Sequence, residues 1–363
     1  MTIDANGAFS ATYAQARARF VHAAAQAGAE LHTCAHPLRG PQDEALAMDL
    51  AWLGPRQARR VLVSLSGTHG IEGFAGSACQ LAWLISDHAR ALPPDTAVWL
   101  VHAVNPWGFS WLRRVNEDNI DVNRNALAPG EPLPHNPDYA HVHTLMQAAG
   151  HTPQALLAQV QGLMQQWGPR RTTRAITGGQ ASHADGLFFC GLAPCWSVRQ
   201  LAQAAAQALA GARQVAVLDH HTGLGPRGHT EIICRHPADS LALRLARRWW
   251  GEDTTATELG ESSSEVIDGN VRMAFARWCP DALVVAAALE VGTQPPEQVL
   301  RALLADHQWH QQSPAVRTDA APVQQAMRAA FAPEDAAWRQ ACVQRAMALY
   351  AATLDGLQTA EAP

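Results

Sequence analysis

Residues 60–84 read RVLVSLSGTHGIEGFAGSACQLAWL. The stretch opens at 60–67 with a short, continuous apolar run, which suits a buried strand of a mainly parallel sheet. Apolar residues at helical spacing follow it from 74 to 92. A strand, a glycine-rich turn and a helix in this order predict an α/β fold, and the turn carries His69 and Glu72, two residue types that bind metals.

The rest of the chain continues the alternation of strands and helices. Further strands are predicted at 96–106, 214–223, 229–234 and 281–293, and an edge strand at 45–54. Helices are predicted at 9–28, 197–210, 295–308 and 321–356. This order predicts a doubly wound α/β fold, in which a mixed, mainly parallel sheet has helices on both of its faces.

One long segment, at about 126–196, interrupts this alternation. It is rich in Pro, Gly, Gln and His, looks irregular as far as residue 185, and carries one helical piece near 153–166. Long segments of this kind in a compact domain are usually functional, and we interpret this one as an insertion that covers a cleft. Since no linker or repeat divides the sequence, we expect a single domain over residues 1–363.

The composition excludes several classes of protein. Hydrophobic residues make up 48% of the 363 residues and charged residues 16%, which is typical of a globular protein. The sequence contains no lysine, so a Schiff-base lysine, a pyridoxal-phosphate site and a P-loop lysine are all excluded. The formal net charge of −5 argues against general nucleic-acid binding.

The cysteines and the N-terminal sequence bear on the compartment. The seven cysteines are an odd number without a CxxC pair, and we interpret them as reduced, mostly buried thiols. The first twenty residues contain no apolar stretch of the signal-peptide type. The sequence contains no run of about eighteen apolar residues that would predict a membrane span. We therefore expect a cytoplasmic protein that does not bind membranes.

Polar residues follow the predicted strands at the point where each strand ends. In open α/β sheets, ligands bind beyond the carboxyl ends of the strands, so these residues are candidates for a functional site. The candidates are His69, Glu72, Asn105, Arg113, Arg114, Asn123, Arg124, His220, His221 and Glu290.

His69 and Glu72 are spaced so that both can reach one metal ion. A catalytic zinc site uses three His or carboxylate ligands and leaves a position for water, and His221 is the obvious third ligand. The alternative is that these are ordinary polar residues at strand ends. A phosphate-binding loop is a weaker alternative, because GTHGIEG lacks both the GxGxxG spacing and a lysine.

The arginines and the last strand offer groups that can bind and act on a substrate. Asn123 and Arg124 lie in NIDVNRN, a segment too polar for a core, and arginine suits the recognition of carboxylates. The alternative is an ordinary surface turn. Glu290 closes an apolar strand, so it is either a general base whose pKa burial has raised or a carboxylate paired with an arginine.

Five segments in this order resemble the zinc carboxypeptidase (M14-like) superfamily, which also includes the succinylglutamate desuccinylases and aspartoacylases. The segments are GTHGIEG (67–73), NPWGF (105–109), the arginines leading to DVNRN (121–125), DHHTG (219–223) and ALEVGT (288–293). The sequence is most similar to the bacterial DUF2817 group, through SGTHGIEGFAGS and HTGLGP. The resemblance extends from about 45 to 293 and implies a zinc carboxypeptidase-like fold.

The resemblance implies one zinc ion per chain, held by His69, Glu72 and His221. It places the third ligand directly before Thr-Gly, which selects His221 and not His220. Asp219 matches the aspartate that orients the site without binding the metal itself.

The resemblance also assigns groups to the substrate. Asn123 and Arg124 match the pair that holds a free carboxylate. Arg114 matches the arginine that polarises the scissile carbonyl, and Arg113 stays open as the alternative because the spacing to the pair varies. Glu290 matches the catalytic glutamate.

The sequence departs from the pattern in two ways. The peptidase branch has a tyrosine that closes over the substrate, and none of Tyr13, Tyr139 and Tyr350 lies between the third ligand and Glu290. The insertion is the second departure. Within it, Gln180 and His183 either contact the substrate or, as we prefer, stabilise the insertion itself.

Together these features predict a zinc-dependent amide hydrolase for a small molecule or short peptide with a free carboxylate, as in a carboxypeptidase. One alternative is an N-acyl amino acid deacylase of the aspartoacylase type, and another is a non-catalytic zinc-binding protein that retains the fold. The sequence leaves the oligomeric state open.

Overall fold

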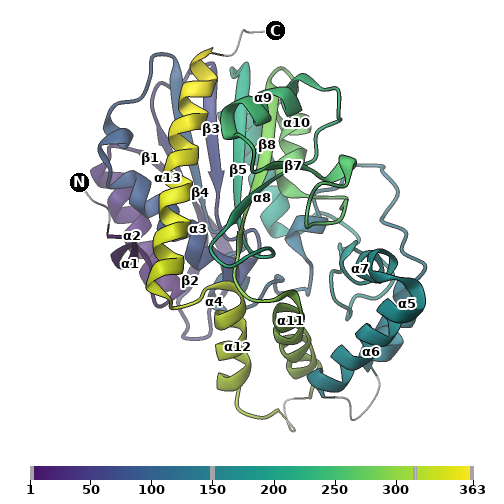
Figure 1. Cartoon of the computed structure of the whole chain (residues 1–363). Helices are drawn as coiled ribbons and strands as arrows, with labels where there is room; N and C mark the ends of the chain where they lie inside the picture. The colour runs from purple at the N-terminus through teal and green to yellow at the C-terminus, as the bar shows by residue number, and fades with distance from the viewer. Residues whose placement is uncertain (1–3, 148–151, 314, 316, 360–363) are drawn as a thin grey trace.

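The computed structural model describes residues 4–147, 152–313, 315 and 317–359. In this part of the chain, eight strands form a sheet in the order β1-β2-β4-β3-β5-β8-β6-β7 (Figure 1). The strands are β1 (Glu30–Arg39), β2 (Ala45–Leu53), β3 (Arg60–Leu65), β4 (Thr96–His102), β5 (Gln214–Gly223), β6 (Thr230–Cys234), β7 (Thr254–Ala256) and β8 (Leu283–Gly292). The central strands β4, β3, β5 and β8 run parallel, which confirms the predicted mixed, mainly parallel sheet.

The described helices surround this sheet. They are α1 (Ala5–Ala8), α2 (Tyr13–Gln26), α3 (Gly73–Leu84), α4 (Pro106–Ser110), α5 (Tyr139–Gln147), α6 (Pro153–Trp167), α7 (Pro169–Thr177), α8 (Trp196–Ala208), α9 (Leu241–Trp250), α10 (Val271–Trp278), α11 (Pro296–Gln311), α12 (Ala321–Phe331) and α13 (Ala336–Thr359). Short 3-10 turns lie at η1 (Gly70–Glu72), η2 (Asp87–Arg90), η3 (Val122–Arg124) and η4 (Thr257–Leu259).

Helices cover both faces of the sheet, as predicted. Because successive side chains of a strand point to opposite faces, Leu62 and Leu218 pack with α2, α3, α9 and α13 on one face. Val63 and Val217 point the other way and pack with α8 and α10. Every residue of β5 is buried, as expected for a strand covered on both sides.

The strand order reverses between β3 and β5. From β3 the chain passes through α3 to β4 on one side, and it later returns to β5 on the other side. A crevice forms at such a reversal, beyond the carboxyl ends of the strands. The chain puts η1 and the ends of β5 and β8 there.

Glycines of the 67–73 turn and of α3 allow the backbone to pack closely against neighbouring segments. A Cβ atom at Gly70 would lie 2.0 Å from the carbonyl carbon of Gly108, and one at Gly76 would lie 2.7 Å from Ser66 Cβ and 3.0 Å from His220 Cβ. Larger residues cannot take these positions unless backbone moves. Small residues therefore let α3, which is buried along its whole length, lie directly on the sheet.

The prediction of an edge strand at 45–54 is wrong. β2 is an inner strand between β1 and β4, and β1 forms this edge of the sheet. β1 gives little signal because its residues are mostly exposed, and it contains Pro37 where its register shifts between Ala35 and Arg39. Proline is tolerated at such irregular edge positions.

The insertion is more regular than predicted. It contains α5 and α7 in addition to α6, so the expectation of a single helical piece is wrong. α7, with the sequence PRRTTRAIT, has few apolar residues and forms as a helix packed on α5 and α6. In the C-terminal region, the predicted helical stretch is two helices, because Pro333 lies in the break between α12 and α13.

Two further observations concern the cysteines and the length of the helices. All seven cysteines are buried and free. Within the described ranges, no helix combines the length and the apolar character needed to cross a bilayer.

Substitutions at two helical glycines test the packing of α3. Gly76→Ala should lower the free energy of unfolding by about 1–3 kcal/mol, because the added methyl group overpacks against Ser66 and His220. The matched control is Gly162→Ala in α6, where a Cβ atom meets nothing within 4 Å. That change should raise stability by about 0.5–1 kcal/mol through helix propensity. Urea unfolding measures both, and equal effects would contradict the packing argument.

Candidate active site

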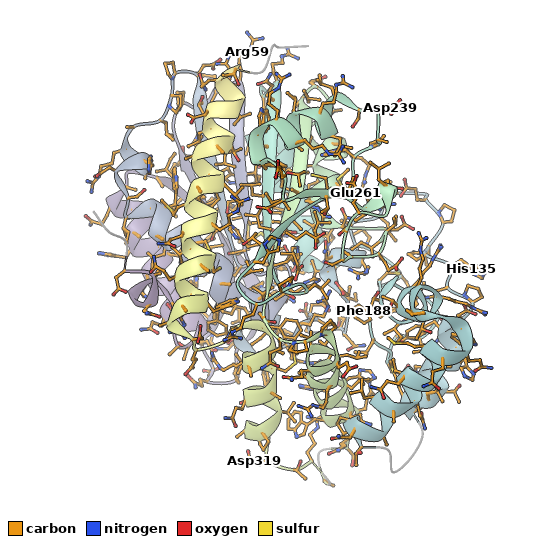
Figure 2. All side chains as sticks on the ribbon, in the orientation of Figure 1. Arg59, His135, Phe188, Asp239, Glu261 and Asp319 are labelled. Atoms are coloured by element: carbon orange, nitrogen blue, oxygen red, sulfur yellow. The ribbon has the colours of Figure 1, made fainter. Side chains whose placement is uncertain are left out.

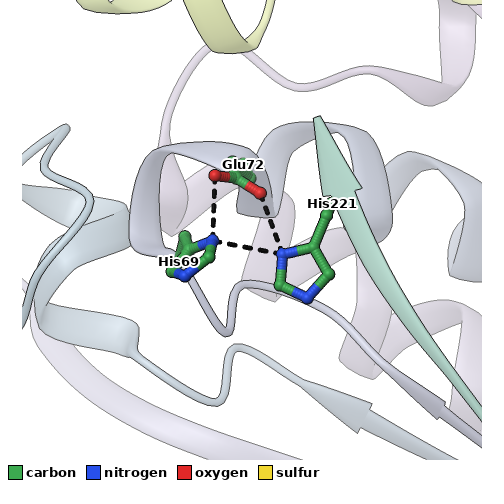
Figure 3. Close-up of side chains that lie close together, drawn as sticks. All are labelled: His69, Glu72 and His221. Atoms are coloured by element: carbon green, nitrogen blue, oxygen red, sulfur yellow. Dashed lines mark hydrogen bonds and ion pairs between the residues drawn. The ribbon is translucent and has the colours of Figure 1, made fainter. Parts of the chain in front are cut away.

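Three buried side chains converge beyond the ends of β3 and β5. His69 precedes η1, Glu72 ends it, and His221 lies near the end of β5 (Figure 3). His69 Nδ1 is 3.0 Å from Glu72 Oε1, His221 Nδ1 is 3.1 Å from Glu72 Oε2, and the two Nδ1 atoms are 3.1 Å apart. One ligand atom from each lies within 4.8 Å of the others, which is compact enough for a single ion.

A carboxylate lies behind each imidazole of the triad. Asp121 Oδ1 is 3.1 Å from His69 Nε2, and Asp219 Oδ2 is 2.9 Å from His221 Nε2. A carboxylate that accepts a hydrogen bond from one ring nitrogen fixes the tautomer of the imidazole. It also makes the other ring nitrogen a better metal ligand. Asp219 was predicted from the sequence, whereas Asp121 was missed. The signal for Asp121 is its position at the start of DVNRN, where it also caps η3 through the amide of Asn123.

The electrostatics of this cluster fit a divalent cation. Burial opposes the charged imidazolium, yet the charges and hydrogen bonds of Asp219 and Glu72 raise the pKa of His221 to about 10. Burial also opposes ionisation of Glu72, but the charges of His69 and His221 lower its pKa well below the usual range. The carboxylates thus stabilise a positive charge between the two Nδ1 atoms. Two histidines and one glutamate are a known set of zinc ligands.

The structure separates the two adjacent arginines. Arg114 points into the site, where its guanidinium donates to Asp121 at 3.1 Å and to Glu72 at 3.3 Å. Arg113 points away and donates to Asp306 of α11 at 3.1 Å. Of the two candidates for the carbonyl, Arg114 is the one that lines the cavity.

Asn123 and Arg124 also face the cavity, from η3. Arg124 donates to the carbonyl of Thr177 at 2.8 Å, and Asn123 Oδ1 accepts from the amide of Val271 at 3.1 Å. The ring of Phe188 lies against both Arg114 and Arg124, with guanidinium carbons 5.2 and 5.5 Å from its centroid. The insertion therefore holds both cationic side chains in place.

Glu290 lies beside the triad on β8. It is the register partner of His221, so the two side chains emerge on the same face of the sheet. Its Oε1 accepts from the amide of Leu224 at 2.9 Å. Burial, followed by the charge of Glu72, raises the pKa of Glu290 to about 7. A carboxyl group with this pKa can exchange a proton near neutral pH.

The triad, the substrate-facing residues Arg114, Asn123 and Arg124, and Glu290 border one cavity of about 550 Å3. The polar residues of its lining include His69, Glu72, Arg114, Asn123, Arg124, His221, Arg272 and Glu290. An apolar wall, made by Leu157, Val160, Met164, Ile176, Phe188, Val299, Leu300, Leu303 and Phe331, faces the cavity from α6, α7, α11 and the segments beside them. Figure 2 labels Phe188 between the insertion helices and α11. Residues of α6 and α7 and Phe188, all within the insertion, line part of the cavity.

Several residues considered from the sequence lie away from the cavity. His220 points to the opposite face, where its Nε2 is 2.6 Å from the hydroxyl of Tyr350. Gln180 bonds within the insertion, to the backbone of His183 and Leu187, so the preferred stabilising role fits its contacts. None of the three tyrosines, all of which are described, lines the cavity.

Arg272 was missed by sequence reasoning. It lies at the start of α10, is 3% exposed, and lines the cavity. VRMAFARW reads as an ordinary amphipathic helix, and nothing in it marks one arginine as different from another.

Comparisons with known proteins agree with this architecture. The sequence profile of the family described as "Protein of unknown function (DUF2817)" matches residues 9–345. No curated protein matches the sequence.

Solved structures share the fold at low sequence identity. Bovine thrombin-activatable fibrinolysis inhibitor, in complex with tick carboxypeptidase inhibitor, is 12% identical, with a TM-score of 0.53 over 96% of this chain and 97% of that one. A second structure of thrombin-activatable fibrinolysis inhibitor is 10% identical, with a TM-score of 0.54 over 96% and 75%. The succinylglutamate desuccinylase from Chromobacterium violaceum is 16% identical over 80% and 74%, but its TM-score of 0.38 is too low to carry weight. The similarity establishes a carboxypeptidase-like α/β fold.

Adjacent histidines give a matched test of the metal site. His221→Ala should abolish binding of zinc, because it removes one of three ligands. His220→Ala should retain about one zinc ion per chain and lose stability, because it removes the hydrogen bond to Tyr350. Elemental analysis after dialysis against micromolar zinc measures the metal content. Loss of zinc only in His220→Ala would reverse the ligand assignment.

Proposed function

The chain belongs to the DUF2817 family, and on that premise we propose that it is a zinc-dependent amide hydrolase. Its substrate is a small molecule or short peptide with a free carboxylate, as for a carboxypeptidase. One observation carries this proposal: the His69–Glu72–His221 triad, Glu290 and the guanidinium groups of Arg114 and Arg124 border the same cavity.

A zinc ion would be held by His69, Glu72 and His221, with Asp121 and Asp219 supporting the two imidazoles. When bound, the ion supplies Lewis acidity and lowers the pKa of a water molecule to about 7. The chain itself must then bind the substrate, move the proton and stabilise the charge that develops on the carbonyl.

Glu290 is the group that moves the proton. Its buried carboxylate lies on the same face of the sheet as His221, and its pKa of about 7 suits both acceptance and return of a proton. It accepts the proton of the attacking water and then protonates the leaving amine. The amide of Leu224 holds one oxygen of the carboxylate in position.

Arg114 stabilises the developing oxyanion. Its guanidinium is fixed by Asp121 and Glu72, so its charge is already oriented before the reaction begins. Preoriented charges of this kind stabilise a transition state without the cost of reorganisation.

Arg124 and Asn123 bind the free carboxylate of the substrate. The Oδ1 atom of Asn123 is occupied by Val271, so its amide nitrogen is the group that can donate to a carboxylate. Binding the substrate at a point away from the reacting amide supplies orientation, which can contribute a large part of the rate enhancement.

The apolar wall supports a second candidate, an N-acyl amino acid deacylase. Side chains of α6, α7 and α11 present a surface that fits an acyl chain as well as the side chain of a peptide residue. A comparison of N-acyl amino acids with dipeptides of the same C-terminal residue would separate the two activities. Failure to cleave either class with zinc bound would favour the third interpretation, a non-catalytic zinc-binding protein.

Substitution of the proposed base should separate metal binding from turnover. Glu290→Gln should keep zinc and lose about 10²–10⁴-fold in kcat, because the amide cannot accept a proton. The control is Glu258→Gln, which changes an exposed carboxylate in η4 outside the cavity. Zinc content and hydrolysis of a cleaved substrate are measured together. Near wild-type hydrolysis by Glu290→Gln would exclude the assignment.

The same carboxylate predicts a pH dependence. Since only the ionised form accepts a proton, kcat/KM should fall as the pH is lowered through the pKa of Glu290, which burial raises to about 7. A bound cation favours the ionised form, so the acid limb should lie at or below this pH. The pH profile of kcat/KM measures it, and the limb should be absent from the residual activity of Glu290→Gln.

The adjacent arginines give a second matched pair. Arg114→Met should lower kcat by about 10²–10³-fold, because an oriented charge at the carbonyl is lost. Arg113→Met should preserve kcat but lower the free energy of unfolding by roughly 3–5 kcal/mol, because it leaves Asp306 buried without this partner. Steady-state kinetics and urea unfolding distinguish them. The reverse pattern would assign the carbonyl to Arg113.

A further inference from the structure

Arg272 is a buried cation without a direct partner. It is 3% exposed, and its Nε atom is buried without a hydrogen bond. Among the residues that the structure describes, none forms a hydrogen bond or an ion pair with its guanidinium. Leaving such a charge buried is costly, so an arginine in this position calls for a ligand.

The other two arginines of the cavity are satisfied by the chain. Arg114 donates to Asp121 and Glu72, and Arg124 donates to the carbonyl oxygen of Thr177. Burial lowers the pKa of Arg272, the charge of Asp219 opposes this shift in part, and the neighbouring charge of Arg235 adds to it. Burial also lowers the pKa of Arg124, to about 10, but Arg124 has the carbonyl oxygen of Thr177 as a direct partner and Arg272 has none in the described part of the chain.

The carboxylates around Arg272 are directed elsewhere. Asp219 accepts a hydrogen bond from Thr68 through Oδ1 and faces His221 through Oδ2. Glu290 accepts from the amide of Leu224. Glu265 and Glu297 also line the cavity, and neither forms an ion pair with Arg272 in the described structure.

Arg272 reaches the same cavity as the proposed reaction centre. Ile233 on β6 and Ala288 on β8 are register partners, and both line the cavity together with Glu290, two residues further along β8. Asn123 accepts from the amide of Val271, so the proposed carboxylate-binding pair is joined directly to the turn that carries Arg272. Arg272 therefore borders the same cavity as the proposed carboxylate-binding pair, Asn123 and Arg124.

We infer that Arg272 is a specificity residue that binds a second anionic group of the substrate. The substrate then carries two carboxylates on the amino acid that is released, one for Arg124 and Asn123 and one for Arg272. An acidic amino acid in amide linkage has this chemistry, and the apolar wall accommodates the group on the other side of the amide. This inference rests on the proposed function for the reaction and on Arg272 for the selectivity.

Isosteric substrates test the inference in the zinc-loaded protein. N-acyl-glutamate should be cleaved with a kcat/KM about tenfold or more above that of N-acyl-glutamine, because the guanidinium gains a charge-assisted partner only from glutamate. Arg272→Met should remove this preference by lowering kcat/KM for N-acyl-glutamate toward the value for N-acyl-glutamine. A preference that persists in Arg272→Met, or that is absent from the unchanged protein, would overturn the inference.

A second arginine of the same helix provides the control. Arg277→Met removes a positive charge from an exposed position of α10 and should leave the preference for glutamate intact. Zinc content and circular dichroism establish that each variant is folded and loaded. If Arg272→Met does not fold, the comparison of the two substrates in the unchanged protein still decides.

Binding distinguishes failure of this inference from failure of the proposed function. Glutarate and its monoamide, glutaramate, differ only in one charged group, and calorimetry measures their affinities without any turnover. Tighter binding of glutarate that disappears in Arg272→Met supports the anion site even if no amide is cleaved. Equal affinities would refute the anion site even if the protein proves to be a hydrolase.

Discussion

The geometry of the active site depends on Glu72, a carboxylate that stays ionised although it is buried. This carboxylate is 1% exposed and lies between two imidazoles, which hold its pKa far below the usual range. A charge in this setting is stable only with paired opposite charge and fixed hydrogen bonds. Asp121 and Asp219 in turn position the imidazoles, and Arg114 compensates part of the negative charge. The site is therefore a network in which the role of each group depends on the next.

The topology of the sheet is what allows this network to form. Because β3, β5 and β8 are parallel neighbours, their carboxyl ends bring η1, His221 and Glu290 together from distant parts of the sequence. The small residues of α3 let it lie on the sheet directly behind η1. The insertion then adds the apolar wall and packs Phe188 against two arginines. The site thus combines a polar side, which comes from the strand ends, with an apolar wall, which comes from the helices beside them.

Individual residues show how far sequence reasoning reaches. Adjacent residues of a strand point to opposite faces of the sheet, so only one of His220 and His221 can lie beside Glu72. The family pattern selected His221, which is the one that does. The same pattern left Arg113 and Arg114 unresolved, and the structure separated them by sending Arg113 to Asp306. The mistaken edge strand has a physical cause, because β1 is too exposed to show an apolar alternation.

By itself, the sequence determined the alternation of strands and helices, the family, and the residues that gather at the strand ends, because these are encoded in local runs and short motifs. Only the tertiary structure decided which of those side chains meet. It also revealed Asp121 behind His69 and Arg272 without a partner, and it showed that α6, α7 and α11 form one wall. Such features arise when segments that are distant in the sequence are brought together by the fold. The sequence around an arginine in a helix does not indicate which groups its side chain will face.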